Sequence, residues 1–421
     1  MSDPVREQPG WNEGAELGVR ASRFGEMLDT IRRSNPFYQR KLSGASIETL
    51  PFTTRAEIQQ DQIENPPYGT NLTFCLERFV RLHQTSGTTT PLRWLDTAES
   101  WAWFRDGWRL VLECAGVVPS DRVLVPFSFG PFIGFWGGFE AAIDLGCFVL
   151  PAGGMTTSAR LRYLLDHAVT VVCCTPTYAM RLAEVAQTEG LDLAGSAVRV
   201  LVVAGEPGGS IPATRRRIES AWGARVFDHS GMTEIGAYGF QCGSDPTSMH
   251  VLETEFIPEV IDPTSGAGVA DGTEGELVLT NLGRWGSPLI RYRTGDLVRM
   301  IRSRCACGRW FARLQGGILG RADDMLVVRG NNVFPSTIEG VLREFDEVAE
   351  FAIVSGLQRP LTELAIAVEP KAGVGVDGLA ERIVEGVRDR LHFRPTVRLV
   401  SPGSLLRSEM KSRRVIPESP G

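Results

Sequence analysis

The sequence predicts an α/β fold: a large N-terminal domain of βαβ units with mixed sheets, joined by a hinge to a small C-terminal α+β domain. The chain has 421 residues, which is too long for a single hydrophobic core. Up to about residue 240, short apolar runs rich in β-branched residues alternate with stretches of helical period. After residue 250 the apolar runs are shorter and carry turn signals, which indicates a change of architecture.

Four runs in the first half of the chain are typical of buried strands, because they are apolar and stopped by Gly or Pro. They are RVLVPFS (122–128), CFVLPAG (147–153), TVVCCTP (170–176) and RVLVVAG (199–205). Between them, helical spacing appears in SARLRYLLDH (158–167) and TYAMRLAEVAQ (177–187). Strands that alternate with helices predict a parallel sheet covered by helices.

The second half of the chain predicts the end of the large domain and the whole of the small domain. Shorter strands are expected at 275–283 and 296–302, and Pro335 could open a helix in the segment 320–345. The elements expected after it are a strand at 348–356, a strand at 363–370, a helix at 378–392 and a strand at 396–402. We therefore expect a large domain over residues 1–321, a boundary near residues 321–324, and a small mobile domain over residues 322–421.

Composition and charge exclude several classes of function. The net charge is −6 and the pI is about 5.6, so nucleic acids and anionic membranes, which need a basic face, are not expected partners. No apolar run is long enough to predict a membrane span, and the polar start of the chain is unlike a signal peptide. Adjacent Cys173 and Cys174 in an apolar run are typical of free thiols in a reducing, cytoplasmic protein.

A hydroxyl-rich loop with one glycine follows the strand-like run RFVRLHQ (78–84). The loop consists of Thr85, Ser86, Gly87, Thr88, Thr89 and Thr90. Backbone N–H groups in such a turn can form an anion-binding nest, and hydroxyls add donors. The loop is not a Walker A sequence, which needs a lysine, so a phosphate loop and a threonine-rich surface turn both remain open.

Three further stretches combine a turn with a functional group. DHSGMTEIG (228–236) places Glu234 in a polar turn, where a carboxylate suits Mg²⁺ beside phosphates. RYRTGDL (291–297) places Asp296 after a glycine, where a carboxylate can accept both hydroxyls of a ribose. AGEPGG (204–209) ends a predicted strand with glycines that let a flat purine approach the backbone. Taken singly, each stretch also fits a helix cap, a turn or a loop.

In this order and spacing, the stretches resemble the adenylate-forming (acyl-AMP) enzyme superfamily, and in particular its phenylacetate–CoA ligase branch. The resemblance covers nearly the whole chain. The segments that point to this branch are RSNPFYQRKL (33–42), LPFTTRAEI (50–58), FIPEVIDP (256–263), GRADDMLVVRGNNVFPSTIE (320–339) and SEMKSRRV (408–415). The resemblance implies that ATP, with Mg²⁺, activates an aromatic carboxylic acid to aryl-AMP, and that a thiol then accepts the acyl group.

The resemblance also implies a role for each matching residue. Lys411 would reach in from the small domain during adenylation, where an ammonium stabilises the attacking carboxylate and the α-phosphate together. Glu234 would bind Mg²⁺, and Asp323 would lie at the hinge. The implied nucleotide-binding residues are Thr85, Ser86, Gly87, Thr88 and Thr89 at the phosphates, Gly205, Glu206 and Pro207 at the adenine, Asp228, Ser230, Gly231, Met232 and Thr233 along the site, Asp296 at the ribose, and Arg321.

The sequence departs from the family at two places. The usual phosphate loop reads S-S-G-T-T-G-K-P, whereas here Thr90 replaces the second glycine and Pro91 follows with no lysine. The usual G-A-E-P order is Ala204-Gly205-Glu206-Pro207 in this chain. The loop is therefore expected to meet phosphates through backbone N–H groups and hydroxyls, and the missing lysine puts the affinity for ATP in doubt.

Aromatic residues alternate with glycines in SFGPFIGFWGGF (128–139), which leaves flat walls and space for a planar aryl acid. The expected pocket residues are Phe129, Phe132, Phe135, Trp136 and Phe139, with His229 and Tyr238 as polar candidates for reading a ring substituent. At least some of these aromatics are also expected to fill a core between helices and sheet.

Cys242, His250, Cys305 and Cys307 form a second constellation. Zn²⁺ in structural sites takes four tetrahedral Cys or His ligands, which this set supplies. Because C-x-C is a weaker signal than C-x-x-C, a structural zinc site and free thiols both remain open.

The acceptor thiol is open between free CoA, which the resemblance favours, and the phosphopantetheine arm of a carrier protein in natural-product biosynthesis. The incomplete loop also leaves open a non-catalytic relative that binds an aryl acid or a nucleotide. Glu234, Asp296 and Lys411 together favour an enzyme. Relatives of this branch often form dimers, so a homodimer is a family-level expectation.

Overall fold

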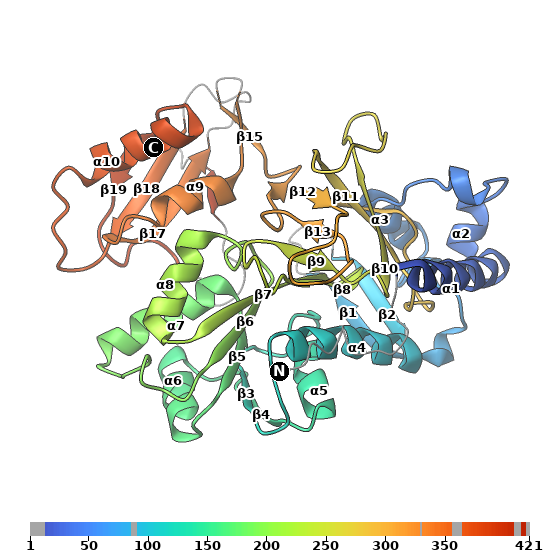
Figure 1. The fold of residues 1–421 in the computed structure, drawn as a ribbon, viewed down its shortest axis with the longest axis horizontal. Helices are drawn as coiled ribbons and strands as arrows, with labels where there is room; N and C mark the ends of the chain where they lie inside the picture. The colour runs from blue at the N-terminus through green and yellow to red at the C-terminus, as the bar shows by residue number, and fades with distance from the viewer. Residues whose placement is uncertain (1–12, 86–90, 329–330, 356–363, 408–413, 418–421) are drawn as a thin grey trace.

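The computed structural model describes residues 13–85, 91–328, 331–355, 364–407 and 414–417. Two parts are distinct in Figure 1: a large part around a 12-stranded sheet, and a small part around a four-stranded sheet near the C-terminus. The predicted fold class is confirmed. The boundary at residues 321 and 322 stays a prediction, and β14 (Gly320–Arg321) is the last strand in chain order that pairs with the large sheet.

One half of the large sheet is parallel. Its strands, in the order β7-β6-β5-β3-β4, are β3 (Arg122–Val125), β4 (Phe148–Pro151), β5 (Val171–Cys174), β6 (Val200–Ala204) and β7 (Arg225–Met232). The helices between them are α5 (Trp136–Asp144), α6 (Thr157–Asp166), α7 (Pro176–Thr188) and α8 (Pro212–Trp222). Strands β3 to β6 and helices α6 and α7 confirm the segments predicted in this half.

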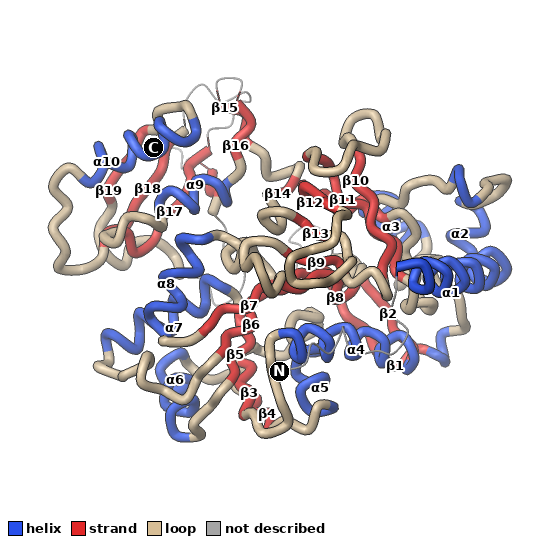
Figure 2. Tube along the Cα trace, in the orientation of Figure 1, coloured by secondary structure: helices blue, strands red, loops and turns tan. Residues whose placement is uncertain are grey.

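The parallel strands are apolar throughout because both faces of the sheet are covered. In β5, Val171 and Cys173 belong to the core under α4 (Ala98–Cys114) and α5, whereas Val172 and Cys174 belong to the core under α6, α7 and α8. Successive side chains of a strand point to opposite faces, so a strand between two helical layers has no polar face. Figure 2 shows the two groups of helices on opposite sides of these strands.

The other half of the large sheet is mainly antiparallel. It consists of β8 (Gly236–Gln241), β9 (Met249–Val251), β10 (Phe256–Ile261), β11 (Glu274–Asn281), β12 (Tyr292–Ile301), β13 (Arg313–Leu314) and β14. Strand β8 runs back along β7, so the loop between them lies at the point where the sheet changes from parallel to antiparallel. In open α/β sheets the carboxyl ends of strands at such a switch point are the usual place for a ligand.

The N-terminal segment covers the antiparallel half and adds a separate hairpin. Its elements are α1 (Glu13–Ser34), α2 (Pro36–Lys41), η1 (Ile47–Thr49), α3 (Arg55–Glu64), η2 (Leu76–Arg78), and the antiparallel pair β1 (Phe79–Gln84) and β2 (Arg93–Thr97).

In α5, a β-carbon at Gly137 would lie 2.5 Å from Trp108 and 2.6 Å from Phe104 of α4. Glycine therefore lets α4 and α5 pack closely through aromatic side chains.

The small part has its own apolar core. Its elements are β15 (Leu326–Val328), β16 (Asn331–Val333), α9 (Pro335–Leu342), β17 (Val348–Ser355), β18 (Ala365–Pro370), α10 (Leu379–Leu391), β19 (Thr396–Leu399) and β20 (Val415–Pro417). Pro335 opens α9 as predicted, whereas β20, which pairs in parallel with β17, was not predicted. None of the helices in the described ranges is long and apolar enough to cross a bilayer.

Arginines connect the small part to α7 and α8 of the large part. Arg217 donates hydrogen bonds to the carbonyl oxygens of Phe345 and Val348, the latter at 2.9 Å. Arg407 forms an ion pair with Glu184 at 3.4 Å. These contacts set the orientation in which the two parts enclose a common space.

Candidate active site

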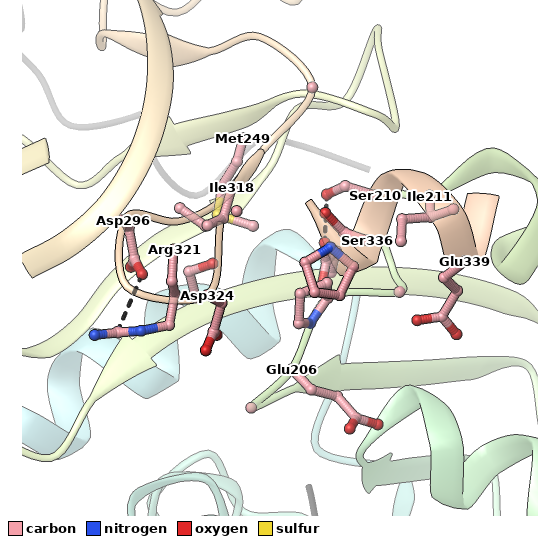
Figure 3. A pocket seen from close by; sticks show the side chains of 18 of the residues that line it. Glu206, Ser210, Ile211, Met249, Asp296, Ile318, Arg321, Asp324, Ser336 and Glu339 are labelled. Carbon is pink, nitrogen blue, oxygen red and sulfur yellow. Dashed lines mark hydrogen bonds and ion pairs between the residues drawn. The ribbon is translucent and has the colours of Figure 1, made fainter. Parts of the chain in front are cut away.

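A cleft of about 440 Å³ lies between the large and the small part. Its large-part wall comes from the ends of β6, β7, β12 and β14, and its small-part wall from α9 and β20. Figure 3 shows Asp296, Arg321 and Asp324 grouped at one end of the cleft and Ser336 and Glu339 at the other. The predicted residues that line it are Gly205, Glu206, Pro207, Asp228, His229, Ser230, Gly231, Met232, Tyr238, Asp296 and Arg321.

The turn after β6 brings backbone to the floor of the cleft. Gly205 has φ +97°, a conformation that L side chains rarely adopt. A β-carbon at Gly209 would lie 2.4 Å from the Asp228 carboxyl carbon. Glu206 accepts a hydrogen bond at 2.8 Å from the backbone N–H of Thr177, at the N-terminus of α7. The turn is thereby fixed, with its backbone open to a flat ligand.

Asp228 and His229 are buried in β7. Asp228 accepts hydrogen bonds from the Ser210 hydroxyl and from the backbone N–H of His229, and burial raises its pKa to about 6. Burial lowers the pKa of His229 to about 4. Its Nδ1 lies 2.6 Å from the carbonyl oxygen of Gly239, which can only accept a hydrogen bond, so Nδ1 carries the proton. The other nitrogen, Nε2, is then an acceptor.

At the end of the cleft that includes Asp324, the buried Tyr238 and Asp296 form a polar group with the half-exposed Arg321. The Tyr238 hydroxyl donates to one Asp296 oxygen at 3.3 Å, and Arg321 donates to the other at 3.4 Å. Asp296 and Arg321 are register partners of β12 and β14. Burial, followed by the charge of Asp296, raises the pKa of Tyr238. Although burial opposes it, the hydrogen bond from Arg321 to Asp323 raises the pKa of Arg321.

Glu234 follows β7 and lies outside the lining of the cleft. Its Oε1 accepts hydrogen bonds from Arg55 at 2.9 Å and from the Tyr292 hydroxyl at 3.4 Å. Arg55 also donates to the hydroxyl of Thr85 at 3.2 Å, so one arginine connects Glu234 to the start of the hydroxyl-rich loop. Within the described ranges no hydrogen bond reaches Oε2 of Glu234. A buried carboxylate with one free oxygen fits Mg²⁺, which prefers hard oxygen ligands.

The structure brings together Cys242, which follows β8, His250 on β9, and Cys305 and Cys307 in the loop between β12 and β13. All four ligand atoms lie within 4.8 Å of one another. The Cys242 and Cys305 sulfurs are 3.4 Å apart, and His250 Nε2 lies 3.2 Å from the Cys307 sulfur. His250 Nδ1 is 3.1 Å from the carbonyl oxygen of Phe311, which directs Nε2 toward the thiols.

Comparison with known families assigns the chain. The AMP-binding enzyme family matches residues 82–283, and the AMP-binding enzyme C-terminal domain matches residues 330–418. A phenylacetate-coenzyme A ligase from Thermus thermophilus is 31% identical over 432 residues, which cover 94% of this chain and 95% of that protein. The chain belongs to the AMP-binding enzyme family. The predicted resemblance is therefore confirmed, and this AMP-binding enzyme is an AMP-forming ligase.

The arrangement of its two parts resembles one state of a solved ligase. The chain matches 2-hydroxyisobutyryl-CoA ligase in the postadenylation state, in complex with R3-HIB-AMP, with a TM-score of 0.92 at 28% identity, over 99% of this chain and 92% of that chain. With the same ligase in the thioesterification state, in complex with 2-HIB-AMP and CoA, the TM-score is 0.72 over 98% and 92%. The same ligase, at 28% identity, is compared in both cases. The difference in TM-score therefore reflects how the two parts are arranged and not a difference in sequence.

Some predicted residues of this AMP-binding enzyme are not described by the structure, and others do not line the cleft. Ser86, Gly87, Thr88, Thr89 and Lys411 lie outside the described residues, and their roles stay predictions. Thr85, Thr233 and Asp323 are described but do not line the cleft. Thr233 accepts a hydrogen bond from Arg284 through its carbonyl oxygen, and Asp323 pairs with Arg321 at 2.9 Å.

Most of the aromatic residues predicted for the acid pocket pack against other aromatic side chains. None of Phe129, Phe132, Phe135 and Trp136 lines the cleft. Phe129 contacts Trp136 with ring centroids 4.6 Å apart. Phe135 contacts Trp108 at 5.8 Å, and Trp108 in turn contacts His229 at 4.3 Å. The aromatic cluster therefore lies directly behind one wall of the cleft, and its role in acid binding stays a prediction.

Sequence reasoning missed the residues that the small part contributes. Ser336, Glu339 and Arg414 line the cleft, as do Asp324, which follows β14, and Ser210 of the large part. Arg414 donates to Glu339 at 3.0 Å and to Thr177 of the large part at 3.4 Å. The only signal for Arg414 in the sequence was its place in SEMKSRRV, close to Lys411. Without that neighbour, an arginine in a charged stretch would be interpreted as an ordinary surface residue.

Proposed function

We propose that this AMP-binding enzyme uses ATP to activate an aromatic carboxylic acid to aryl-AMP and then transfers the acyl group to CoA. The observation that carries the proposal is the shared cleft, in which Asp296 and Arg321 of the large part and Arg414 of the small part line one cavity. The similarity to a phenylacetate-coenzyme A ligase along almost the whole chain supports an aryl acid and CoA.

The strand ends of the large part would hold the nucleotide. The Asp296 carboxylate, which Tyr238 and Arg321 orient from two sides, would accept the ribose hydroxyls. The backbone of Gly205, Glu206 and Pro207 would border the adenine. Asp228, Ser230, Gly231, Met232 and Thr233 would line the rest of the nucleotide, and Arg321 would contact it.

The phosphates would lie toward Thr85 and Glu234, outside the described cleft lining. Glu234 would hold Mg²⁺, which neutralises phosphate charge when bound. Thr85 begins the loop that contains Ser86, Gly87, Thr88 and Thr89, whose N–H and hydroxyl groups would bind the β- and γ-phosphates.

Lys411 would act in the first step. The acid carboxylate attacks the α-phosphorus, the bond to the β-phosphate oxygen breaks, and pyrophosphate leaves. An ammonium between the two anions stabilises this transition state. Arg414, in the same segment, is anchored at the cleft by Glu339 and Thr177, and this supports delivery of Lys411 to the nucleotide.

The acid would lie near His229. Its Nε2 can accept a hydrogen bond from a ring substituent, and the buried Trp108 supports the imidazole from behind, with ring centroids 4.3 Å apart. Phe129, Phe132, Phe135 and Trp136 would shape this region from behind, and Tyr238 would be the second polar group.

In the second step the small domain would rotate about Asp323. Residues 1–321 would stay fixed as the adenylation domain while residues 322–421 move, and the CoA thiol would attack the acyl-AMP carbonyl with AMP as the leaving group. The two states of 2-hydroxyisobutyryl-CoA ligase, which match this chain with TM-scores of 0.92 and 0.72, support such a change.

The Cys242, His250, Cys305 and Cys307 cluster would hold a structural zinc ion. Three thiols and one imidazole whose Nε2 faces them are a complete tetrahedral ligand set. Arg313 donates to the Cys305 sulfur at 3.2 Å, which suits a thiolate. A homodimer and a cytoplasmic location also stay predictions.

Pyrophosphate exchange into ATP tests the proposal. The panel contains benzoic, phenylacetic, anthranilic, indole- and quinoline-carboxylic acids, with 2-hydroxyisobutyric acid as the aliphatic control. We expect exchange with an aryl acid, and release of an aryl-CoA once CoA is added. Exchange without CoA acylation would assign the acceptor to a carrier protein. Binding of an aryl acid with no exchange would assign the protein to the non-catalytic class.

A further inference from the structure

The loop that begins at Thr85 lacks the lysine of the family pattern, because Thr90 is followed directly by Pro91. A triphosphate brings several negative charges that need cations close by. Arg55 lies between the start of this loop and Glu234. We propose that the Arg55 guanidinium binds the terminal phosphates of ATP, and the pyrophosphate product, in place of the missing lysine. The proposal rests on the proposed function.

The backbone that carries Arg55 is held in place on both sides. Arg55 is the first residue of α3, and Thr54 caps the helix by accepting the N–H of Glu57 at 3.2 Å. Glu57 in turn accepts the N–H of Thr54 at 2.7 Å. The buried Thr53 donates its N–H to the carbonyl oxygen of Arg291, beside the start of β12, at 2.9 Å. Arg55 therefore projects from a fixed point.

The guanidinium of Arg55 connects two segments of the phosphate site. One nitrogen donates to Glu234 at 2.9 Å and the other to the hydroxyl of Thr85 at 3.2 Å. The same hydroxyl accepts the N–H of Leu92 at 3.0 Å, so Arg55 contacts the place where the loop leaves and rejoins the β1–β2 pair. Tyr292 shares Glu234 with it at 3.4 Å.

The guanidinium keeps capacity for a further anion. Its hydrogen bonds within the described ranges use two of the five N–H groups that an arginine has. The Arg55 side chain is 39% exposed, whereas that of Glu234 is 10% exposed. A planar fork of this kind binds pairs of phosphate oxygens. Glu234 thus orients the guanidinium, and its exposed N–H groups are left for the β- and γ-phosphates.

The test compares ATP with AMP, which lacks the terminal phosphates. Each nucleotide is titrated calorimetrically, with Mg²⁺, into the wild-type protein, Arg55→Gln and Arg55→Lys. We expect Arg55→Gln to weaken ATP binding about 10- to 100-fold and to leave AMP binding unchanged. Arg55→Lys should recover most of the loss, and the KM for pyrophosphate in the exchange reaction should follow ATP binding.

The matched control is Arg78→Gln, which removes an arginine from an exposed ion pair with Glu99 and should change neither titration. Melting temperatures are measured first, and Arg55→Met replaces Arg55→Gln if the latter does not fold. Equal weakening of ATP and AMP would show that Arg55 only supports the structure of the site. Unchanged ATP binding would also overturn the inference.

The same titrations separate this inference from the proposed function. If the wild-type protein binds ATP and AMP but exchanges pyrophosphate with no acid, the proposed function fails, and the variants still decide the role of Arg55. If the wild-type protein binds neither nucleotide, both fail together.

Discussion

The two walls of the cleft are made by different kinds of contact. In the large part, Tyr238 and Asp296 are 1% and 6% exposed and are fixed by buried hydrogen bonds between strands. The small part is attached through arginines at the edge, such as Arg407, whose ion pair with Glu184 leaves the two side chains 19% and 34% exposed. The groups proposed to bind the nucleotide are thus preorganised, whereas the small part is attached by polar contacts that a rearrangement could exchange.

The large-part wall of the cleft, which we call the fixed wall, should give the largest loss of activity when one charge is removed. Asp296→Asn removes the carboxylate that orders Tyr238 and Arg321 and that would accept the ribose hydroxyls. We expect kcat/KM for ATP in pyrophosphate exchange to fall about 100-fold, because charge-assisted hydrogen bonds contribute roughly 1.5–3 kcal/mol each. The control is Glu274→Gln on the surface of β11. A loss below about threefold would contradict the assignment of Asp296.

The Cys/His cluster, which is proposed to hold zinc, offers a way to destabilise the large-part wall from outside the cleft. Cys242 and His250 lie on or next to β8 and β9, which support Tyr238. We expect about one zinc ion per chain by elemental analysis, and Cys305→Ser should lose it and destabilise the large part by about 3 kcal/mol. The control is Cys75→Ser, which alters an exposed free cysteine. A wild-type protein free of zinc whose melting temperature a chelator leaves unchanged would contradict the prediction.

The cleft residues of the large part were predictable because they follow local rules. Gly205, Asp228 and Asp296 lie in or beside predicted strands, in turns rich in glycine, and the edge of one sheet brings such positions together. The Cys242 to Cys307 set was predictable from ligand type and spacing, although 63 positions separate Cys242 from Cys305.

The rest depended on long-range packing that leaves no local pattern. Arg55 reaches Glu234, 179 positions away, from a helix start that looks ordinary in sequence. Arg414 and β20 reach the cleft only because β20 pairs with β17. Phe129 and Trp136 are as aromatic as pocket residues, but their rings pack edge to face against each other and do not line the cleft. Such outcomes depend on which helices meet, and composition does not contain that information.

A smaller effect is expected on the pH dependence of stability, through a buried carboxyl group in the large-part wall. Burial raises the pKa of Asp228 from 3.8 to about 6. The folded state therefore binds this proton more tightly than the unfolded state, so its stabilising contribution is complete below pH 3.8 and is lost as the pH rises through 6. Asp228→Asn removes this dependence, and we expect it to stabilise the large part by about 2 kcal/mol at pH 8 relative to pH 4.

Calorimetric melting of wild type and Asp228→Asn at both pH values measures this difference. Asp324→Asn in the small-part segment after β14 serves as the comparison, because burial also raises its pKa, although Arg321 opposes the shift. A melting difference between wild type and Asp228→Asn that does not change with pH would show that the Asp228 carboxyl is not protonated more readily in the folded state.

The smallest effect is expected at the replaceable attachment, and it should be selective. Arg217→Ala removes hydrogen bonds to the carbonyl oxygens of Phe345 and Val348 without touching the cleft. The loss of about 1 kcal/mol should slow pyrophosphate exchange about fivefold, because the arrangement that resembles the postadenylation state becomes less populated. Transfer of the acyl group from preformed acyl-AMP to CoA should not slow, since the proposed mechanism assigns that step to the other arrangement. Arg162→Ala on α6, whose ion pair with Glu189 lies within the large part, is the matched control. If Arg217→Ala slows both half-reactions equally, the contact stabilises the fold rather than one orientation of the small part. The proposed contrast between a preorganised large-part wall and an exchangeable small-part attachment would then be wrong.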